Sequence, residues 1–225
     1  MSRRIPWLRV SGEAVVIVAS ILLAFGLQAW WERRSDRQTE RTVLSELHTS
    51  LSEDLELLEL RLARFRNIER RVASLLSHLR SGAPYADSLD AYFGTTYGLL
   101  RTELNTGAYE SLKSQGLGLL SDPVLRSHVA RVYEQTYRRV EFQVELETDV
   151  VLGVLRPYFL LHFRDLILAQ SATPLDYQAL SRDVEFLNLL AYRLQTVGQV
   201  HTSQFEQALS DVRGLIEAIE LALET

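Results

Sequence analysis

Residues 44–79 read LSELHTS LSEDLEL LELRLAR FRNIERR VASLLSH L, written here in groups of seven. Each group begins with an apolar residue, and a second apolar residue follows three or four positions later in every complete group. This seven-residue repeat places an apolar stripe along one side of an α-helix. Neither Gly nor Pro interrupts residues 36–80, so we predict one helix of roughly 65 Å. The turn-forming sequence Ser81-Gly82-Ala83-Pro84 should end it.

A second helix of the same kind is predicted at the C-terminal end, over residues 183–223. Apolar residues recur there in steps of three and four, and His201 breaks the pattern once. The apolar positions are Leu187, Leu190, Leu194, Val197, Phe205, Val212, Leu215 and Ile219. Two long amphipathic helices at opposite ends of one chain are natural antiparallel partners. His201 allows a buried ligand or a pH-sensitive role, but we prefer a hydrogen-bonded core histidine.

Turn-forming residues divide the sequence between these two helices. We expect four further helices, over residues 87–104, 106–115, 121–155 and 158–168. Gly94 and Gly98 weaken the first, and Gly116 is a C-cap for the second. Ser121-Asp122-Pro123 is a start signal for the third, which should end before Pro157. We find no alternating strand pattern of useful length.

The first forty residues differ from the rest of the chain. An apolar run extends from Ala14 to Leu27, and the wider segment from Val10 to Trp31 is long enough for a helix to cross a bilayer. Tryptophan is enriched where such helices meet the membrane interface. We therefore expect a basic N-terminal tail over residues 1–9, a transmembrane anchor over 10–31 and a soluble helical-bundle domain over 32–225.

A cleaved secretory signal peptide is the alternative, because Ala24-Phe25-Gly26 supplies small residues of the kind found at cleavage sites. Cleavage after Gly26 would leave Leu27 and two tryptophans exposed at the new end, so a retained anchor explains more residues. The residues before the segment include only basic charges, whereas the arginines after it alternate with acids. This difference favours a cytoplasmic N-terminus and a body outside the cytoplasm.

Composition limits the class of protein further. The chain has a formal net charge of -5, and its first 41 residues are net basic, so the body is strongly acidic. An acidic body argues against nucleic acid as a partner. The absence of cysteine excludes disulfides, thiolate metal sites and cysteine nucleophiles. The predicted fold class is all-α: an N-terminal transmembrane helix followed by an elongated antiparallel helical bundle, with coiled-coil-like first and last helices.

Two stretches resemble a bacterial domain-of-unknown-function family of small single-span membrane proteins. In the anchor the matching residues are Gly12, Glu13, Leu22, Leu23, Ala24, Gln28, Trp31, Glu32 and Arg34. In the body they are Thr106, Tyr109, Leu112, Gly116, Leu120, Asp122, Leu125 and Tyr133. The chain departs from such proteins in using Arg for Lys and in having Ala29-Trp30 before Trp31. The resemblance implies a membrane-anchored helical domain and supplies no established activity or cofactor. From the anchor and its charge asymmetry we expect a single-pass protein of the bacterial inner membrane, with a cytoplasmic N-terminus and a periplasmic body.

Two groups of residues are candidates for contacts with partners. On the predicted anchor, Glu13, Ser20, Ala24 and Gln28 share one face, and Ser20 and Ala24 have the spacing that lets two helices approach closely. The alternative is an interfacial Glu13 beside incidental small residues. In the body, aromatic and cationic side chains gather as a candidate interaction surface: Tyr109, Lys113, Arg126, Arg131, Tyr133 and Tyr137. We prefer the alternative that these tyrosines pack inward at a helical corner.

The sequence contains no recognisable catalytic motif. The five histidines lack the spacing of a helical metal site, and Gly116-Leu117-Gly118 lacks the preceding strand of a dinucleotide loop. We therefore expect no enzyme activity, cofactor or metal. The favoured function is a membrane-anchored scaffold or protein-interaction module, with the bilayer and a second copy or another membrane protein as partners. The alternative is a ligand-sensing bundle outside the cytoplasm that signals through a partner.

Overall fold

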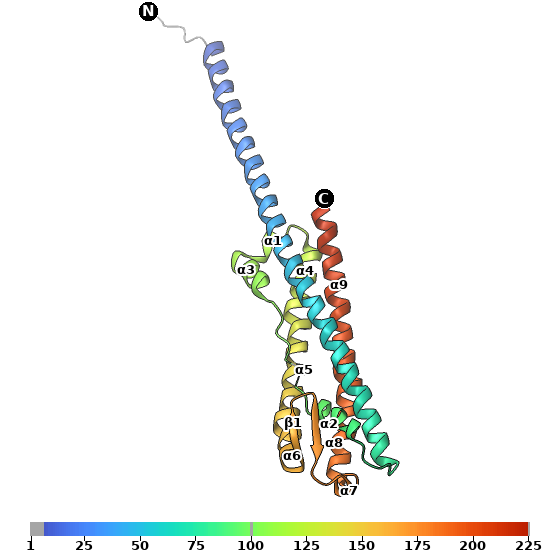
Figure 1. Ribbon diagram of the computed structural model, residues 1–225. Coiled ribbons are helices and arrows are strands. Elements are labelled where there is room, and N and C mark those ends of the chain that lie inside the picture. Colours follow the sequence, from blue (N-terminus) through green and yellow to red (C-terminus); the bar gives the residue numbers. More distant parts are fainter. Residues whose placement is uncertain (1–6, 100, 225) are drawn as a thin grey trace, which may run out of the picture.

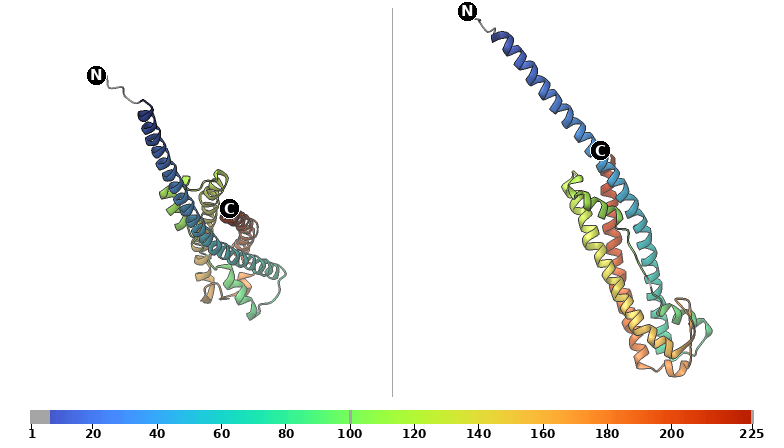
Figure 2. Two further views of the ribbon diagram at one scale, coloured as in Figure 1. Left: turned by 90° about the horizontal axis from the view of Figure 1, so that it is seen from above. Right: turned by 90° about the vertical axis from the view of Figure 1, so that its left-hand side faces the viewer.

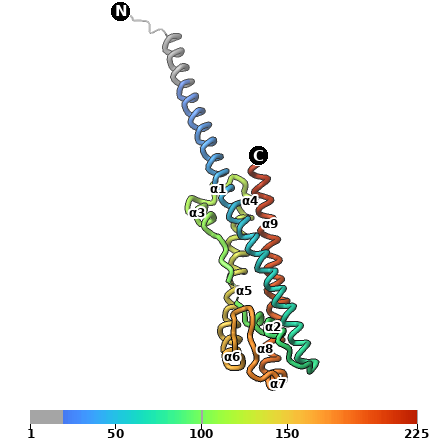
Figure 3. The backbone as a smooth tube through the Cα atoms, viewed as in Figure 1, coloured from blue at the N-terminus to red at the C-terminus, as the bar shows by residue number. Residues whose placement is uncertain are grey.

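The computed structural model describes the backbone of residues 7–99 and 101–224, and the side chains of residues 20–99 and 101–224. Helices account for 82% of the chain, so the predicted helical class is confirmed. They form an elongated antiparallel bundle, and α1 continues well beyond one end of it (Figures 1 and 2). The tube in Figure 3 follows the same path.

The first helix, α1 (Trp7–Arg80), is one continuous element of 74 residues. Every residue that begins a seven-residue group in the sequence is buried: Leu44, Leu51, Leu58, Phe65, Val72 and Leu79. Buried side chains in the described part of the chain begin at Val43, although the helix begins far earlier. The apolar stripe therefore defines which part of α1 belongs to the bundle, and the preceding part extends away from it.

The predicted C-terminal helix is confirmed as a nearly continuous run that packs along α1. It comprises α8 (Val184–Gln195), the π-helical segment η5 (Thr196–His201) and α9 (Thr202–Glu224). Asp183 caps its start by accepting a hydrogen bond from the backbone N–H of Glu185. Its deepest residues are fully buried against α1: Leu190, Val197, Phe205, Val212, Leu215 and Ile219.

The third long helical run is longer than the sequence suggested. It comprises α4 (Pro123–Arg131), η3 (Val132–Thr136), α5 (Tyr137–Val150), η4 (Val151–Leu155) and α6 (Arg156–His162). Asp122 caps it as predicted. Our prediction that Pro157 ends this helix was wrong. The π-helical η4 changes the hydrogen-bond spacing just before Pro157, which then occupies the first turn of α6, where a missing N–H is tolerated.

The distal end of the bundle also contains strands that we did not predict. The expected helix over residues 158–168 ends at His162, and β1 (Phe163–Ile167) and β2 (Ser171–Pro174) form an antiparallel hairpin. The short α7 (Tyr177–Leu180) follows. Five- and four-residue strands carry too little alternation to be recognised in a sequence.

This hairpin explains the two glycines that interrupt the expected helix over 87–104. Among the described residues of that region, helical structure is limited to η1 (Asp87–Leu89) and α2 (Asp90–Thr96). A Cβ on Gly94 would lie 2.2 Å from the backbone nitrogen of Ser171, and a Cβ on Gly98 would lie 2.8 Å from the Cβ of Ala169. The glycines therefore allow the hairpin backbone to contact α2 directly.

The next elements lie at the opposite end of the bundle, where the N-terminal part of α1 projects from it (Figure 1). There α3 (Gly107–Gln115) and η2 (Leu117–Leu119) form the corner before α4. Gly116 ends α3 with a φ of 105°, a conformation that favours glycine. Both the second expected helix and its glycine cap are thus confirmed.

Candidate functional site

The three tyrosines of the candidate interaction surface lie in the core. Tyr109, Tyr133 and Tyr137 are all buried, and the rings of Tyr109 and Tyr133 stack with centroids 4.6 Å apart. Tyr137 contacts Tyr133 at 4.9 Å. A partner at the surface would not reach these rings, so the aromatic part of the predicted surface is corrected to an internal stack.

Two of the three cationic side chains in the candidate surface make contacts at the corner formed by α3, η2 and α4. Lys113 Nζ lies 3.1 Å from Glu134 Oε1, which also accepts a hydrogen bond from the Tyr109 hydroxyl. Burial and this carboxylate raise the pKa of the Tyr109 hydroxyl. Arg126 donates to the Leu120 carbonyl, and Arg131 is exposed. The corner is a structural unit in which the hydroxyl and the ammonium group share one carboxylate.

A buried carboxylate that we did not predict lies beside the tyrosine stack. Asp54 on α1 accepts hydrogen bonds from the Tyr137 hydroxyl, at 2.6 Å, and from the backbone N–H of Asn105. Burial raises the pKa of Asp54, and the bonds from Tyr137 and Asn105 offset only part of that rise. Asp54 follows Leu51 by three residues and precedes Leu58 by four. The sequence therefore indicated this buried carboxylate by placing an acidic residue on the apolar stripe.

A second buried polar cluster joins the two other long helical runs. Glu147 on α5, Arg193 on α8 and His201 in η5 are 1%, 0% and 3% exposed. Arg193 Nη1 donates to Glu147 Oε2 at 2.5 Å, and His201 Nε2 lies 3.2 Å from the same oxygen. Arg193 also donates to the Gly98 carbonyl. Two π-helical segments, η4 and η5, adjoin this cluster, which we call the Glu147 cluster.

The electrostatics of this cluster favour an ionised carboxylate. Burial alone would raise the pKa of Glu147, but the hydrogen bond from His201 and the charge of Arg193 outweigh burial and lower it. His201 is thus a hydrogen-bonded core residue, as we preferred. Arg193 follows Leu190 by three residues and precedes Val197 by four, so the sequence again signalled a charge on a buried stripe. The side chains are too deeply buried to act on a substrate in solution.

The described residues contain no group of three or more His, Asp or Glu side chains arranged to hold a metal ion. The cavities along the bundle are surface grooves. One of them, of about 750 Å³, lies between α1 and η5 beside Gly198 and is lined by the Arg66–Glu206 ion pair.

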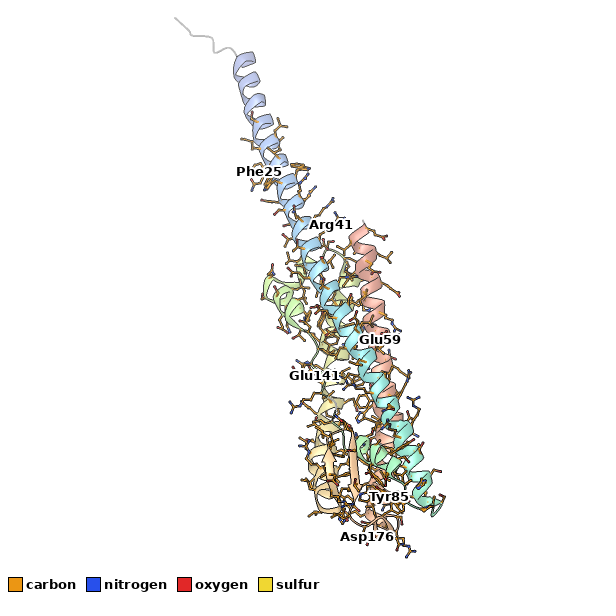
Figure 4. The ribbon with its side chains drawn as sticks, in the orientation of Figure 1. Phe25, Arg41, Glu59, Tyr85, Glu141 and Asp176 are labelled. Carbon is orange, nitrogen blue, oxygen red and sulfur yellow. The ribbon has the colours of Figure 1, made fainter. Side chains whose placement is uncertain are left out.

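The most unusual surface is the part of α1 that precedes the bundle. Seven large apolar side chains in it are between 49% and 75% exposed: Ile21, Leu22, Leu23, Phe25, Leu27, Trp30 and Trp31. They occupy all sides of the helix, and Figure 4 shows Phe25 well away from the other helices. A helix that is apolar all round is typical of a segment enclosed by protein or lipid.

The candidate helix contact lies on the same segment. Glu13 is outside the residues whose side chains are described, as is the first part of the predicted anchor, residues 10–19. Ser20 and Ala24 are exposed, and Gln28 Nε2 donates to Glu32 Oε1 at 3.0 Å. Within the described part of the chain, no helix has the length and apolarity needed to span a membrane.

No protein-family model, curated protein or solved structure matches the chain. The family resemblance noted in the sequence therefore stays a prediction.

Proposed function

We propose that the protein is a single-span, membrane-anchored helical scaffold that presents its bundle to a protein partner or to a second copy. The observation that carries this proposal is the group of exposed apolar residues from Ile21 to Trp31, on the part of α1 that precedes the bundle. Leaving this many large apolar side chains in water would be costly, at about 25 cal/mol for each Å² of apolar surface. Lipid would cover all sides of the helix at once.

The sequence before Ile21 supports the same proposal. Residues 10–19 are mostly apolar and adjoin the exposed segment directly, so together the two parts have the length of a bilayer span. The tryptophan pair would then lie at the interface on the side of the bundle. We propose the bacterial inner membrane as the location, with residues 1–9 in the cytoplasm and the bundle in the periplasm.

A scaffold role for the bundle is supported by its surface. Of the large apolar residues exposed beyond the anchor, many lie on one stretch from α5 to the end of the hairpin: Phe142, Leu146, Leu152, Val154, Leu160, Leu161, Ile167, Leu168 and Leu175. Exposed apolar side chains that gather into one patch are typical of protein–protein contacts, and we propose that some of these residues contribute to such a patch. This stretch includes the end of the bundle furthest from the proposed anchor (Figure 1).

Alkaline extraction of membranes tests the anchor. The full chain should remain in the membrane pellet, whereas a Leu23→Arg/Phe25→Arg variant should be released, because each charge at the centre of a span costs about 3 kcal/mol. Leu60→Arg/Leu161→Arg is the matched control, since both leucines are exposed on the bundle, and it should stay in the pellet. Release of the unmodified chain would contradict the anchor.

A further inference from the structure

Four arginines on α1 lie immediately after the exposed tryptophans, and they share one side of the helix. Counted from Trp30, Arg34, Arg37 and Arg41 follow at four, seven and eleven residues, which is the spacing of a single helical face. Arg33 flanks the same face, four residues before Arg37. All four side chains are exposed. The segment thus carries a one-sided cationic stripe.

The acidic residues of this segment form a separate row. Glu32, Asp36 and Glu40 recur every four residues, and Asp36 and Glu40 each stand three residues after an arginine of the stripe. Glu32 accepts a hydrogen bond from Gln28, and Glu40 accepts two from Ser121, through its backbone N–H at 2.7 Å and its hydroxyl at 2.9 Å. Among the ion pairs of the described residues, none includes an arginine of the stripe.

The arginines of the stripe differ in the contacts that they make with other residues of the protein. Arg41 donates to the Leu223 carbonyl near the end of α9, and Figure 4 shows it where α1 joins the bundle. The Arg34 guanidinium lies 5.7 Å from the centre of a Trp30 ring, a contact that leaves its N–H groups free to bind an anion at their edge. Arg33 and Arg37 have no hydrogen-bond or ion-pair partner among the described residues.

Distances along the helix axis determine which arginines of the stripe lie at the depth of the lipid headgroups. With a rise of 1.5 Å per residue, Arg33 and Arg34 lie about 3 to 5 Å beyond Trp31, and Arg37 about 9 Å beyond. The polar headgroup region on each side of a bilayer is roughly 5 to 8 Å deep. Arg34, Arg37 and Arg41 also line a groove of about 610 Å³ along this face. Phosphate oxygens suit the planar, multidentate guanidinium group.

We propose that Arg33, Arg34 and Arg37 bind the phosphate groups of anionic lipids in the leaflet next to the bundle. This inference rests on the proposed membrane anchor. Because the arginines occupy one side of the helix, the bound lipids would gather on that side and would not form an even ring. The protein would therefore select anionic lipids over zwitterionic lipids of the same chain length.

Quenching of tryptophan fluorescence by brominated lipids tests this selectivity on the full chain in nanodiscs. All variants carry Trp7→Phe, so that only Trp30 and Trp31 emit. The bilayer contains phosphatidylcholine and phosphatidylglycerol at a fixed ratio, with bromine on the acyl chains of one lipid or the other. We expect phosphatidylglycerol to be favoured by up to about fivefold, equivalent to about 1 kcal/mol for a basic residue near the surface, and 0.5 M salt to reduce the preference.

The variants separate this proposal from the anchor. Arg33→Gln/Arg37→Gln should bring the preference close to one, whereas the control Arg138→Gln/Arg139→Gln, which removes two exposed arginines from α5, should leave it unchanged. An equal response to both lipids in the unmodified stripe, or a preference that survives Arg33→Gln/Arg37→Gln, would overturn the lipid proposal alone. If neither brominated lipid quenched Trp30 and Trp31, the anchor and the lipid site would both be wrong.

Discussion

Replacing Arg193 by methionine tests the energetics of the Glu147 cluster. Arg193 and Glu147 are fully buried and joined by a direct hydrogen bond, and after the substitution Glu147 would retain only His201. Removing one partner of a buried ion pair leaves an uncompensated charge and costs about 3 to 5 kcal/mol. We expect Arg193→Met to lower the free energy of unfolding by that amount, a large part of the total stability of an ordinary domain.

A second substitution shows that the loss comes from the stranded charge. Glu147→Gln removes the charge but keeps an amide oxygen that His201 can contact. The double variant Glu147→Gln/Arg193→Met should therefore be more stable than Arg193→Met by about 2 kcal/mol. Arg66→Met is the matched control, because Arg66 and Glu206 form an ion pair whose side chains are 53% and 49% exposed. Its cost should stay below about 1 kcal/mol.

Urea unfolding of residues 36–225, followed by far-UV circular dichroism, measures these differences. This fragment retains every buried side chain of the described residues. A cost of Arg193→Met no larger than that of Arg66→Met would refute the stabilisation of Glu147 by Arg193. Additive effects of Glu147→Gln and Arg193→Met would also contradict it, because independent effects would mean that the two residues do not stabilise each other.

Four other changes test separate parts of the structure. Gly94→Ala should destabilise the fragment by about 1 to 3 kcal/mol in the same urea assay, because the new methyl group meets the Ser171 backbone. The control Gly153→Ala, where nothing lies within 4 Å of the new methyl group, should be neutral or stabilising. Equal effects of the two substitutions would contradict the close contact between Gly94 and Ser171. Tyr137→Phe should cost about 1 to 3 kcal/mol at neutral pH by removing a hydrogen bond to a buried carboxylate, and an unchanged unfolding midpoint would refute this. The pH dependence of stability should have opposite signs at the two buried acids. The pKa of Asp54 is raised in the folded state, so the wild type should gain stability relative to Asp54→Asn as the pH falls from 7 towards 4. The pKa of Glu147 is lowered, so the wild type should lose stability relative to Glu147→Gln as the pH falls below about 4.5, and parallel trends for the two acids would contradict this prediction. Ser81→Cys, in the exposed turn after α1, introduces the only thiol of the chain; a membrane-impermeant maleimide should label it in bacteria whose outer membrane has been made permeable, and labelling only after full lysis would reverse the proposed orientation.

The long helices could be predicted because their pattern repeats many times. Each turn of α1 within the bundle adds another apolar residue on the same side, so errors at single positions do not matter. The caps at Asp122 and Gly116 were recognisable for a different reason, since each depends on the chemistry of one residue type. These features depend only on residues that are close in the sequence.

The hairpin and the buried clusters depend on residues that are distant in the sequence. Gly94 was interpreted as a weak point of a helix, because the segment that it contacts, at Ser171, lies far along the chain. Asp54, Glu147 and Arg193 occupy stripe positions where an apolar residue would be the ordinary choice. Their partners come from other helices, so the sequence indicated that something was unusual without indicating which residues meet.

The continuity of α1 has a mechanical consequence. Since no break separates the exposed apolar segment from the buried stripe that starts near Val43, both parts belong to a single stiff shaft. Each residue of an α-helix turns the shaft by about 100° and advances it by 1.5 Å. One alanine inserted between Arg37 and Gln38 would therefore rotate the whole bundle about the helix axis by more than a quarter of a revolution with respect to the apolar segment. Four inserted alanines would nearly restore the original orientation, with the bundle further from the apolar segment along the axis. The orientation of the bundle about the helix axis is thus set by the number of residues in α1 between the apolar segment and the buried stripe.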